Sequence, residues 1–309
     1  MFPRRRKKPL TWLVFISAGL VLIILFRMSR PDASLKRIQA AGGIVQRSNP
    51  DPRAPVTVIS LTGPEVTDAV LEDCQGQSDL RRLLLSNTGV TDAGLRWLTR
   101  LTSLEELQLN HTAVSDAGLS YLSSLHRLQR LELENCRIAG PGLQRLHDLP
   151  QLREIYLTRN EVTDEGLKQL RGAQQLRTLI VSDNPITDQG LTYLADLLDL
   201  EQLGLSRCRI TDAGLEQLVP LKKLKNLYLV HTAITDKGLC HLSGLNQLEV
   251  LYLDDTKISD TGLASLKGLK KLRILRLVGS GASPVGVVAL KRALPKTAII
   301  LSEGRQLDL

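Results

Sequence analysis

The chain has 309 residues, of which 43% are hydrophobic and 23% are charged, a balance typical of folded proteins. Leucine supplies 63 residues, whereas the three phenylalanines all precede residue 30. The net charge of +8 comes entirely from residues 1–37, which hold nine basic side chains and one acidic, 9 − 1 = 8. Residues 38–309 balance at 31 of each sign. That balance argues against a nucleic-acid partner, which requires clustered, uncompensated Lys and Arg.

The first thirty residues carry a membrane signal. Residues 10–26 contain no charged side chain, and a helix of that length, rising about 1.5 Å per residue, just spans the apolar core of a bilayer. Five basic residues at 4–8 precede this run and favour a cytoplasmic N-terminus. We therefore predict a basic cytoplasmic tail at 1–9 and a single transmembrane helix at 10–26, with the remaining chain outside the cytoplasm. A cleaved signal peptide is the alternative, but no A-x-A-like cleavage site follows the run.

A 24-residue repeat occupies most of the remaining chain. Two leucines two positions apart, such as Leu107 and Leu109, have the spacing of a strand with both side chains on one face. Leucines such as Leu95, Leu98 and Leu101 form a helical stripe. Each unit is thus predicted to be a short strand, a turn and a short helix. Nine glycines mark the repeat without any insertion: Gly94, Gly118, Gly142, Gly166, Gly190, Gly214, Gly238, Gly262 and Gly286.

Stacking of these units determines the predicted fold. One unit cannot bury its own leucines, so stability must come from the interfaces between neighbours. Parallel strands about 4.8 Å apart would give a body on the order of 50 Å long, curved with the narrower strands inside. We predict an α/β solenoid of about ten repeats over residues 56–301, with a curved parallel sheet on the concave side and short helices on the convex side.

Both ends of the repeat region are expected to be capped. Residues 27–55 are predicted to be a linker and N-terminal cap, in which a helix at 34–41 ends at two glycines and a strand at 44–46 pairs with the first repeat strand. At the other end, residues 297–301 are expected to add a terminal strand, and residues 302–309 form a C-terminal tail.

The pattern L-x-x-L-x-L, followed by Thr, Asn or Cys, resembles the leucine-rich repeat family over residues 56–301. The phrase T-D-x-G-L, as in residues 211–215 after Cys208, is similar to the cysteine-containing class found in F-box substrate receptors. The present chain differs from that class in its shorter period, in having Thr at most of the Cys positions, and in lacking a helical F-box before the repeats. The resemblance therefore implies the fold and not a ubiquitin-ligase role.

Recurring polar residues are interpreted as structural. The cysteines lack the spacing of a disulfide framework or zinc site and are interpreted as small buried hydrophobes. The histidines do not accompany a nucleophile in a known motif. We therefore predict no enzyme, catalytic residue, cofactor, metal site or small-molecule substrate. Eight aspartates follow Thr or Ser and are interpreted as helix-capping residues instead of calcium ligands, which must converge on one ion: Asp68, Asp92, Asp116, Asp164, Asp188, Asp212, Asp236 and Asp260.

The residue between the two strand leucines must point away from the core and into the concave face. Exposed aromatic and arginine side chains among aliphatic neighbours are typical of interface hot spots. The alternative is that aromatic residues simply suit a strand. Towards the N-terminus, Glu132 and Glu134 belong to an acidic surface that would steer a basic partner. The predicted partner-binding residues of the tyrosine-rich part are Tyr156, Tyr228, Val230, Tyr252, Asp254 and Arg276.

Together these features predict a membrane-anchored module that captures a protein or peptide on its concave sheet. Two alternatives stay open: a structural or self-associating spacer of the cell envelope, and a cytosol-facing adaptor resembling the repeat part of F-box substrate receptors. Within the family, exported eukaryotic members often carry disulfide-rich caps. The cysteines of this chain form no such cap, which favours a bacterial envelope.

Overall fold

The computed structural model describes residues 33–302 and 305–306. The predicted membrane helix at 10–26 and the basic tail before it lie outside these residues. Within the described part of the chain, no helix is both long and apolar enough to cross a membrane.

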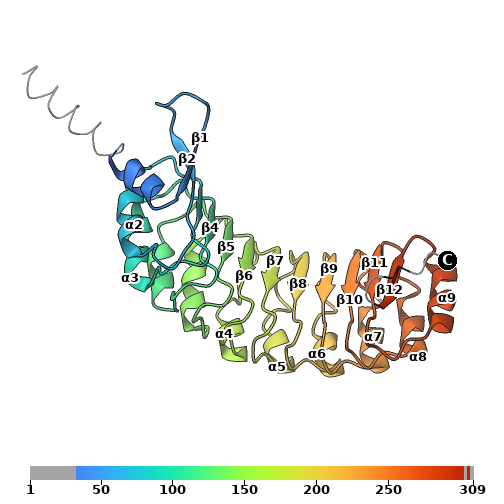
Figure 1. The fold of residues 1–309 in the computed structure, drawn as a ribbon. Coiled ribbons are helices and arrows are strands. Elements are labelled where there is room, and N and C mark those ends of the chain that lie inside the picture. The colour runs from blue at the N-terminus through green and yellow to red at the C-terminus, as the bar shows by residue number, and fades with distance from the viewer. Residues whose placement is uncertain (1–32, 303–304, 307–309) are drawn as a thin grey trace, which may run out of the picture.

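The described residues form a curved solenoid with a single sheet on its inner side and helices on its outer side (Figure 1). The strand order follows the chain order from β1 to β13. From β2 to β12 each strand pairs in parallel with the next, and each residue faces its counterpart 24 positions later. The strands are β1 Ile44–Arg47, β2 Val56–Ser60, β3 Arg82–Leu84, β4 Glu106–Gln108, β5 Arg130–Glu132, β6 Glu154–Tyr156, β7 Thr178–Ile180, β8 Gln202–Gly204, β9 Asn226–Tyr228, β10 Val250–Tyr252, β11 Ile274–Arg276, β12 Ala298–Ser302 and β13 Arg305–Gln306.

The helices are short because each must turn the chain back within one repeat. A Thr or Ser precedes most of the α-helices in extended conformation, and in all of these but α2 its hydroxyl accepts a hydrogen bond from a first-turn N–H, as expected for a cap. Beyond a first helix at residues 33–40, the α-helices and 3₁₀ helices (η) are α2 Asp68–Cys74, α3 Asp92–Leu95, η1 Arg96–Arg100, η2 Gly118–Leu122, η3 Pro141–Asp148, α4 Asp164–Lys168, α5 Asp188–Leu191, α6 Asp212–Glu216, α7 Asp236–Leu242, α8 Asp260–Leu263, η4 Ala264–Leu266 and α9 Pro284–Ala293.

One continuous leucine core runs the length of the solenoid between the sheet and the helices. The middle residue of each three-residue strand, such as Leu107, is fully buried, while its two neighbours face the concave side. Because side chains alternate along a strand, this placement aligns one outward column across the whole sheet, from Ser60 through Tyr156 and Tyr228 to Arg276 and Ile300. The predicted alignment of these residues is confirmed.

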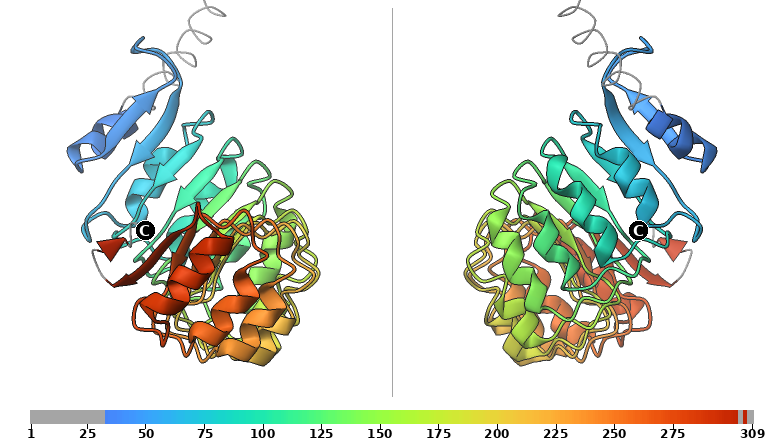
Figure 2. Two further views of the ribbon diagram at one scale, coloured as in Figure 1. Left: turned by 90° about the vertical axis from the view of Figure 1, so that its right-hand side faces the viewer. Right: turned by 90° about the vertical axis from the view of Figure 1, so that its left-hand side faces the viewer.

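Both edges of the sheet are covered by antiparallel strands. At the N-terminal end, the helix at 33–40 leads through Gly42 into β1, which pairs with β2 as expected from the sequence. Gly42 has a φ of 79°, a left-handed conformation that ends the helix. At the C-terminal end, β12 pairs with β13, a strand within the predicted tail that the sequence did not reveal. Figure 2 views the solenoid along its axis from each end.

Candidate functional site

The aspartates do more than cap their own helices. Asp68 Oδ1 accepts a hydrogen bond from the Thr91 N–H at 2.8 Å, and its Oδ2 accepts one from the Thr91 hydroxyl at 2.7 Å. Most of the other recurring aspartates bridge to a Thr or Ser of the following repeat in the same way. The prediction of local capping was therefore incomplete, because each carboxylate also joins two repeats.

This bridging explains the repeated glycine. A Cβ atom at Gly94 would overlap the carboxylate of Asp68 from the preceding repeat, and the same holds at Gly214 against Asp188. The bridge changes once, where Ala139 and Gly140 stand in place of Thr and Asp. There Asp116 accepts hydrogen bonds from three backbone N–H groups, and Gly140 contributes no carboxylate to the next repeat.

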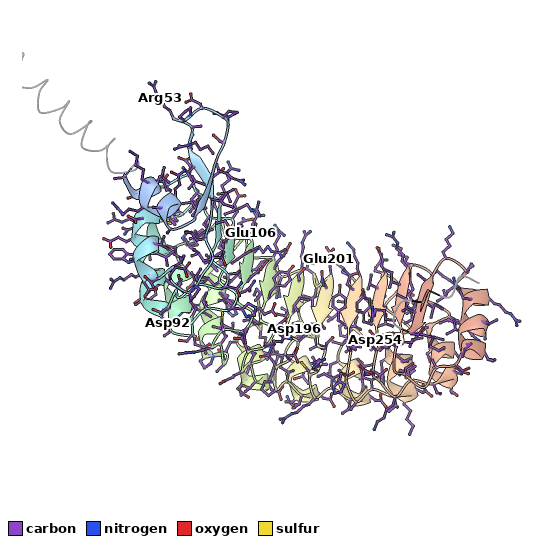
Figure 3. All side chains as sticks on the ribbon, viewed as in Figure 1. Arg53, Asp92, Glu106, Asp196, Glu201 and Asp254 are labelled. Atoms are coloured by element: carbon purple, nitrogen blue, oxygen red, sulfur yellow. The ribbon has the colours of Figure 1, made fainter. Side chains whose placement is uncertain are left out.

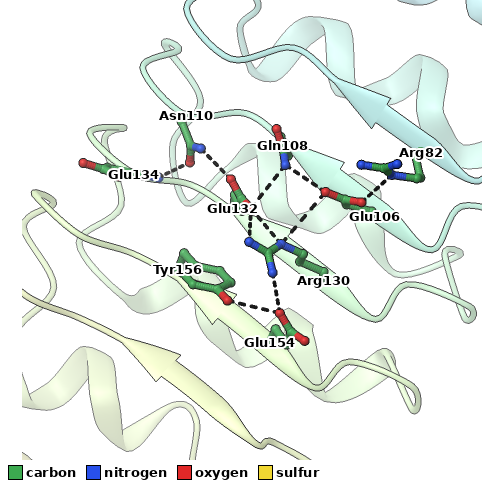
Figure 4. Close-up of polar contacts among 9 residues, drawn as sticks. All are labelled: Arg82, Glu106, Gln108, Asn110, Arg130, Glu132, Glu134, Glu154 and Tyr156. Carbon is green, nitrogen blue, oxygen red and sulfur yellow. Dashed lines mark hydrogen bonds and ion pairs between the residues drawn. The ribbon is translucent and has the colours of Figure 1, made fainter. Parts of the chain in front are cut away.

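The N-terminal half of the concave sheet carries a charged network (Figure 4). We define it by Arg82, Glu106, Gln108, Arg130, Glu132 and Glu154. Arg82 Nε lies 2.6 Å from Glu106 Oε2. Arg130 donates to Glu132 Oε1 at 2.7 Å and to Glu154 Oε2 at 2.7 Å, so one guanidinium joins two strands. Gln108 Nε2 donates to Glu106 and Glu132 at 2.8 and 3.2 Å, completing a continuous set of charge-assisted bonds.

Glu132 is not the free surface carboxylate that the sequence suggested. It is 9% exposed, and its second oxygen accepts from Asn110 Nδ2 at 2.7 Å. Glu134 is different, because only its main chain bonds to its neighbours and its half-buried side chain has no partner among residues 33–302. The charged network together with Glu134 still sums to two positive and four negative groups, 2 − 4 = −2. This set of residues has an acidic excess, but most of its carboxylates are already hydrogen-bonded.

Tyr156 contacts the charged network and not the other tyrosines. The Arg130 guanidinium stacks over its ring at 4.5 Å, and its hydroxyl donates to Glu154 Oε2 at 3.1 Å. Burial and the adjacent Glu154 charge raise the pKa of Tyr156 to about 12. The phenol therefore stays protonated near neutral pH, as its donated hydrogen bond requires.

The middle of the sheet has small side chains. Gly204 lies between Ile180 and Tyr228 in the outward column, and a Cβ there would come within 3.0 Å of the Ile180 side chain. The Ser182 hydroxyl accepts from the Ser206 N–H at 3.2 Å, which bridges two repeats beyond the strand ends. This stretch separates the charged network from the tyrosine surface described next.

The C-terminal half presents what we call the tyrosine surface: Tyr228, Val230, Val250, Tyr252 and Arg276. The two rings pack edge to face with their centroids 5.1 Å apart and an interplanar angle of 71°. Both tyrosines and both valines are half-buried, so part of each side chain faces solvent. Arg276 lies 5.3 Å from the Tyr252 ring centroid, and burial raises the pKa of Tyr228. The structure thus brings four of the predicted residues together in one patch.

Asp254 was predicted within this surface, but it is buried. It is 6% exposed, and its oxygens accept from Arg276 Nε at 2.7 Å and from the Val278 N–H at 2.8 Å. Its carboxylate holds Arg276 in place and bridges two repeats. Figure 3 marks Glu106 and Asp254 in the two halves of the solenoid.

Sequence reasoning missed a column of loop residues with positive φ. They follow the strands at 24-residue intervals and have φ values between 50° and 61°. Asn, Asp and His adopt this conformation more readily than most residues, whereas Arg adopts it here because the repeat geometry imposes it. Their 24-residue spacing is the sequence signal from which this column could have been predicted. They are Asn87, His111, Asn135, Arg159, Asp183, Arg207, His231 and Asp255.

The cysteines are free and differ in environment. Cys74 and Cys208 are buried, and burial raises their pKa values to about 12 and about 11. Cys136 is half-buried and Cys240 is exposed. The interpretation of all four as buried hydrophobes is therefore wrong for Cys240. Across the described residues no group of three or more His, Cys, Asp or Glu side chains could hold a metal ion.

Comparison with known proteins agrees with this architecture. A sequence model of the family described as "Leucine Rich repeat" matches residues 100–123, 149–170, 173–195 and 199–219. These four segments, less than a third of the chain, are similar to that family, and the stacked strand–helix units have the arrangement expected of such repeats. No curated protein matches the chain.

Solved structures share the fold. An internalin of Listeria monocytogenes superimposes with a TM-score of 0.56 and 22% identity, covering 80% of this chain and 81% of that chain. A leucine-rich repeat protein of Leptospira interrogans gives a TM-score of 0.47 and 20% identity over 74% of each chain. At this level of identity, the first likeness concerns the fold alone, and the second adds nothing to it.

Proposed function

We propose that the protein is a non-enzymatic module that is anchored by residues 10–26 and captures a protein or peptide on its concave sheet. Its repeat domain would lie outside the cytoplasm, in a bacterial envelope. The observation that carries the proposal is the tyrosine surface, where two half-exposed rings are held in a fixed mutual orientation among aliphatic side chains. Such preorganised aromatic anchors lose little conformational entropy on binding. Repeat proteins commonly bind partners on their concave surfaces.

The two halves of the sheet favour a partner with two kinds of side chain. The tyrosine surface suits apolar groups, and the acidic excess around Glu134 suits Lys or Arg. Glu132 and Tyr228 are four repeats apart, or roughly 19 Å at the spacing of parallel strands, which about six residues of extended peptide would cover. An extended segment with an apolar end and a basic end therefore fits the surface best.

End-to-end polymerisation is disfavoured as the alternative function. The outermost strands β1 and β13 both run antiparallel to their neighbours, so neither end continues the parallel repeat ladder. In the last repeat, Pro284 takes the position of the recurring aspartate, and no carboxylate is available there to bridge a further repeat. Both features act against a copy stacking on the C-terminal end.

Partner capture can be tested directly. Proximity labelling from the full chain in intact cells identifies partners, and pull-down with Tyr228→Ala plus Tyr252→Ala tests the site. Loss of two hot-spot residues should weaken capture by about 30-fold or more. Tyr121→Ala is the matched control, because Tyr121 is 37% exposed on η2. Full retention of the partner by the double variant would contradict the proposed binding site.

The proposed topology needs its own test. A reporter fused to the C-terminus should be active only when it lies outside the cytoplasm. Activity of a cytoplasmic reporter instead would favour the adaptor function, whatever the outcome of the tyrosine substitutions.

A further inference from the structure

The last helix of the solenoid has an apolar face that no other element among residues 33–302 covers. In α9, Val287 and Leu290 face the core, whereas Val285 and Val288 are 77% and 37% exposed. Pro284 and Ala289 complete a shallow apolar depression with these two valines. In Figure 2, left, α9 faces the viewer with nothing in front of it.

This apolar face is particular to α9 and is not a property of the repeat. The positions equivalent to Val285 and Val288, 24 residues earlier, hold Thr261 and Ala264. One repeat further back they hold Lys237 and Cys240, and before that Ala213 and Glu216. Folding of a repeat therefore does not require large aliphatic residues here. Their exposure at the end of the solenoid calls for another explanation.

The surroundings of this face carry more basic than acidic side chains. Residues 261–302 contain eight Lys and Arg and no Asp or Glu. Of these eight, Arg273 and Arg276 pair with Glu249 and Asp254, and the Asp260 carboxylate is bonded to Ser283 at the start of α9. Lys291 and Arg292 lie three and four positions after Val288, on the same side of the helix. Neither forms an ion pair or hydrogen bond with another described side chain, and the same is true of Lys267 and Lys296. The overall neutrality of residues 38–309 conceals this local excess.

The exposed valines and the basic side chains together favour one class of partner. An isologous contact between two copies would bring Arg292 and its basic neighbours against themselves, and the resulting repulsion disfavours it. Residues 261–302 contain no aromatic side chain on which nucleic-acid bases could stack, and aliphatic side chains do not bind phosphates. An anionic bilayer accepts both groups, because valines enter the boundary of the acyl chains while Lys and Arg meet the headgroup phosphates.

We propose that the C-terminal end of the solenoid docks on an anionic lipid bilayer through α9, with Val285 and Val288 in the interface and Lys291 and Arg292 at the headgroups. This contact is separate from the predicted membrane helix, and it would restrict how the concave sheet is oriented above the membrane. It does not depend on which partner the sheet binds.

Hydrogen–deuterium exchange on the full chain tests this docking. The protein is mixed with nanodiscs of phosphatidylcholine alone or of phosphatidylcholine with phosphatidylglycerol. Peptides covering residues 284–294 should exchange about tenfold more slowly with the anionic discs. Salt at about 1 M should abolish the difference, because it shortens the Debye length to about 3 Å. Peptides from α2, at the other end of the solenoid, serve as the internal control.

Two variants separate the contributions of charge and apolar surface. Lys291→Glu with Arg292→Glu should remove the lipid-dependent slowing, and Val288→Thr should reduce it while leaving the unfolding temperature nearly unchanged. Equal exchange of α9 with both kinds of disc would overturn the proposal. Slowing that is independent of lipid charge but grows with protein concentration would also overturn it, and would identify a second copy as the occupant.

Discussion

The two halves of the concave sheet have the same backbone and opposite chemistry. In β4 to β6 most outward side chains are charged, and they bind mainly one another through Arg130 and Glu132. In β9 to β11 they include Tyr228, Val250 and Tyr252, which keep part of their rings and aliphatic groups exposed, with one hydrogen bond from Gln202 Nε2 to the Tyr228 hydroxyl at 3.3 Å. The difference shows that a repeat position does not by itself make a binding residue. A side chain is available to a partner only where the neighbouring repeats do not already supply its hydrogen bonds.

The largest expected effects test whether the two halves share one core. Leu133 and Leu229 occupy equivalent positions four repeats apart, and both are fully buried. Leu133→Ala and Leu229→Ala should each lower the free energy of unfolding by about 2–5 kcal/mol through loss of packing. Chemical denaturation of both variants measures this. Two separate unfolding transitions, one shifted by each variant, would show that the halves unfold as separate units.

A smaller effect should distinguish the buried and free carboxylates of the charged network. Glu132→Ala removes the acceptor of Asn110 Nδ2 and one of the acceptors of both Arg130 and Gln108, and it should cost about 1–3 kcal/mol. Glu134→Ala is the control two residues away and should change the free energy of unfolding by less than about 0.5 kcal/mol. If thermal and denaturant unfolding gave the two variants equal stability, the network would have no structural role.

The smallest perturbation is alkylation of thiols, and it compares the reactivity of Cys74 in α2 with that of Cys240 in α7. At pH 8, a Cys74 thiol whose pKa is about 12 is deprotonated only to about one part in ten thousand, and the thiolate is the reactive form. Brief treatment with iodoacetamide should therefore label Cys240 first, and all four cysteines only after unfolding. Mass spectrometry of the peptides reads this out. Labelling of Cys74 as fast as Cys240 would reveal that the N-terminal repeats open readily.

Much of the fold was predictable because a 24-residue period repeats the same constraint many times. The alternation around Leu107 and the stripe from Leu95 to Leu101 were enough to predict strand, turn and helix. The outward column followed from strand geometry alone. The bridge from Asp68 to Thr91 was not predictable, because it joins residues 23 positions apart whose separation depends on how the repeats stack.

The candidate site was predicted less well than the fold. The 24-residue spacing correctly indicated that Tyr228 and Tyr252 would be neighbours, but not that Asp254 would be buried and bonded to Arg276. Composition likewise concealed the basic end around α9, because charges of both signs cancel over the whole repeat region. Counting charges by segment would have revealed it.

The sequence by itself determined the repeat, its strand and helix positions, and the column of residues on the inner face, because these depend on local spacing that each unit carries independently. Only the tertiary structure decided which polar groups are saturated and which remain available. The reason is physical: hydrogen bonds between repeats require atoms from different units to come within about 3 Å, and that proximity exists only once the units are stacked.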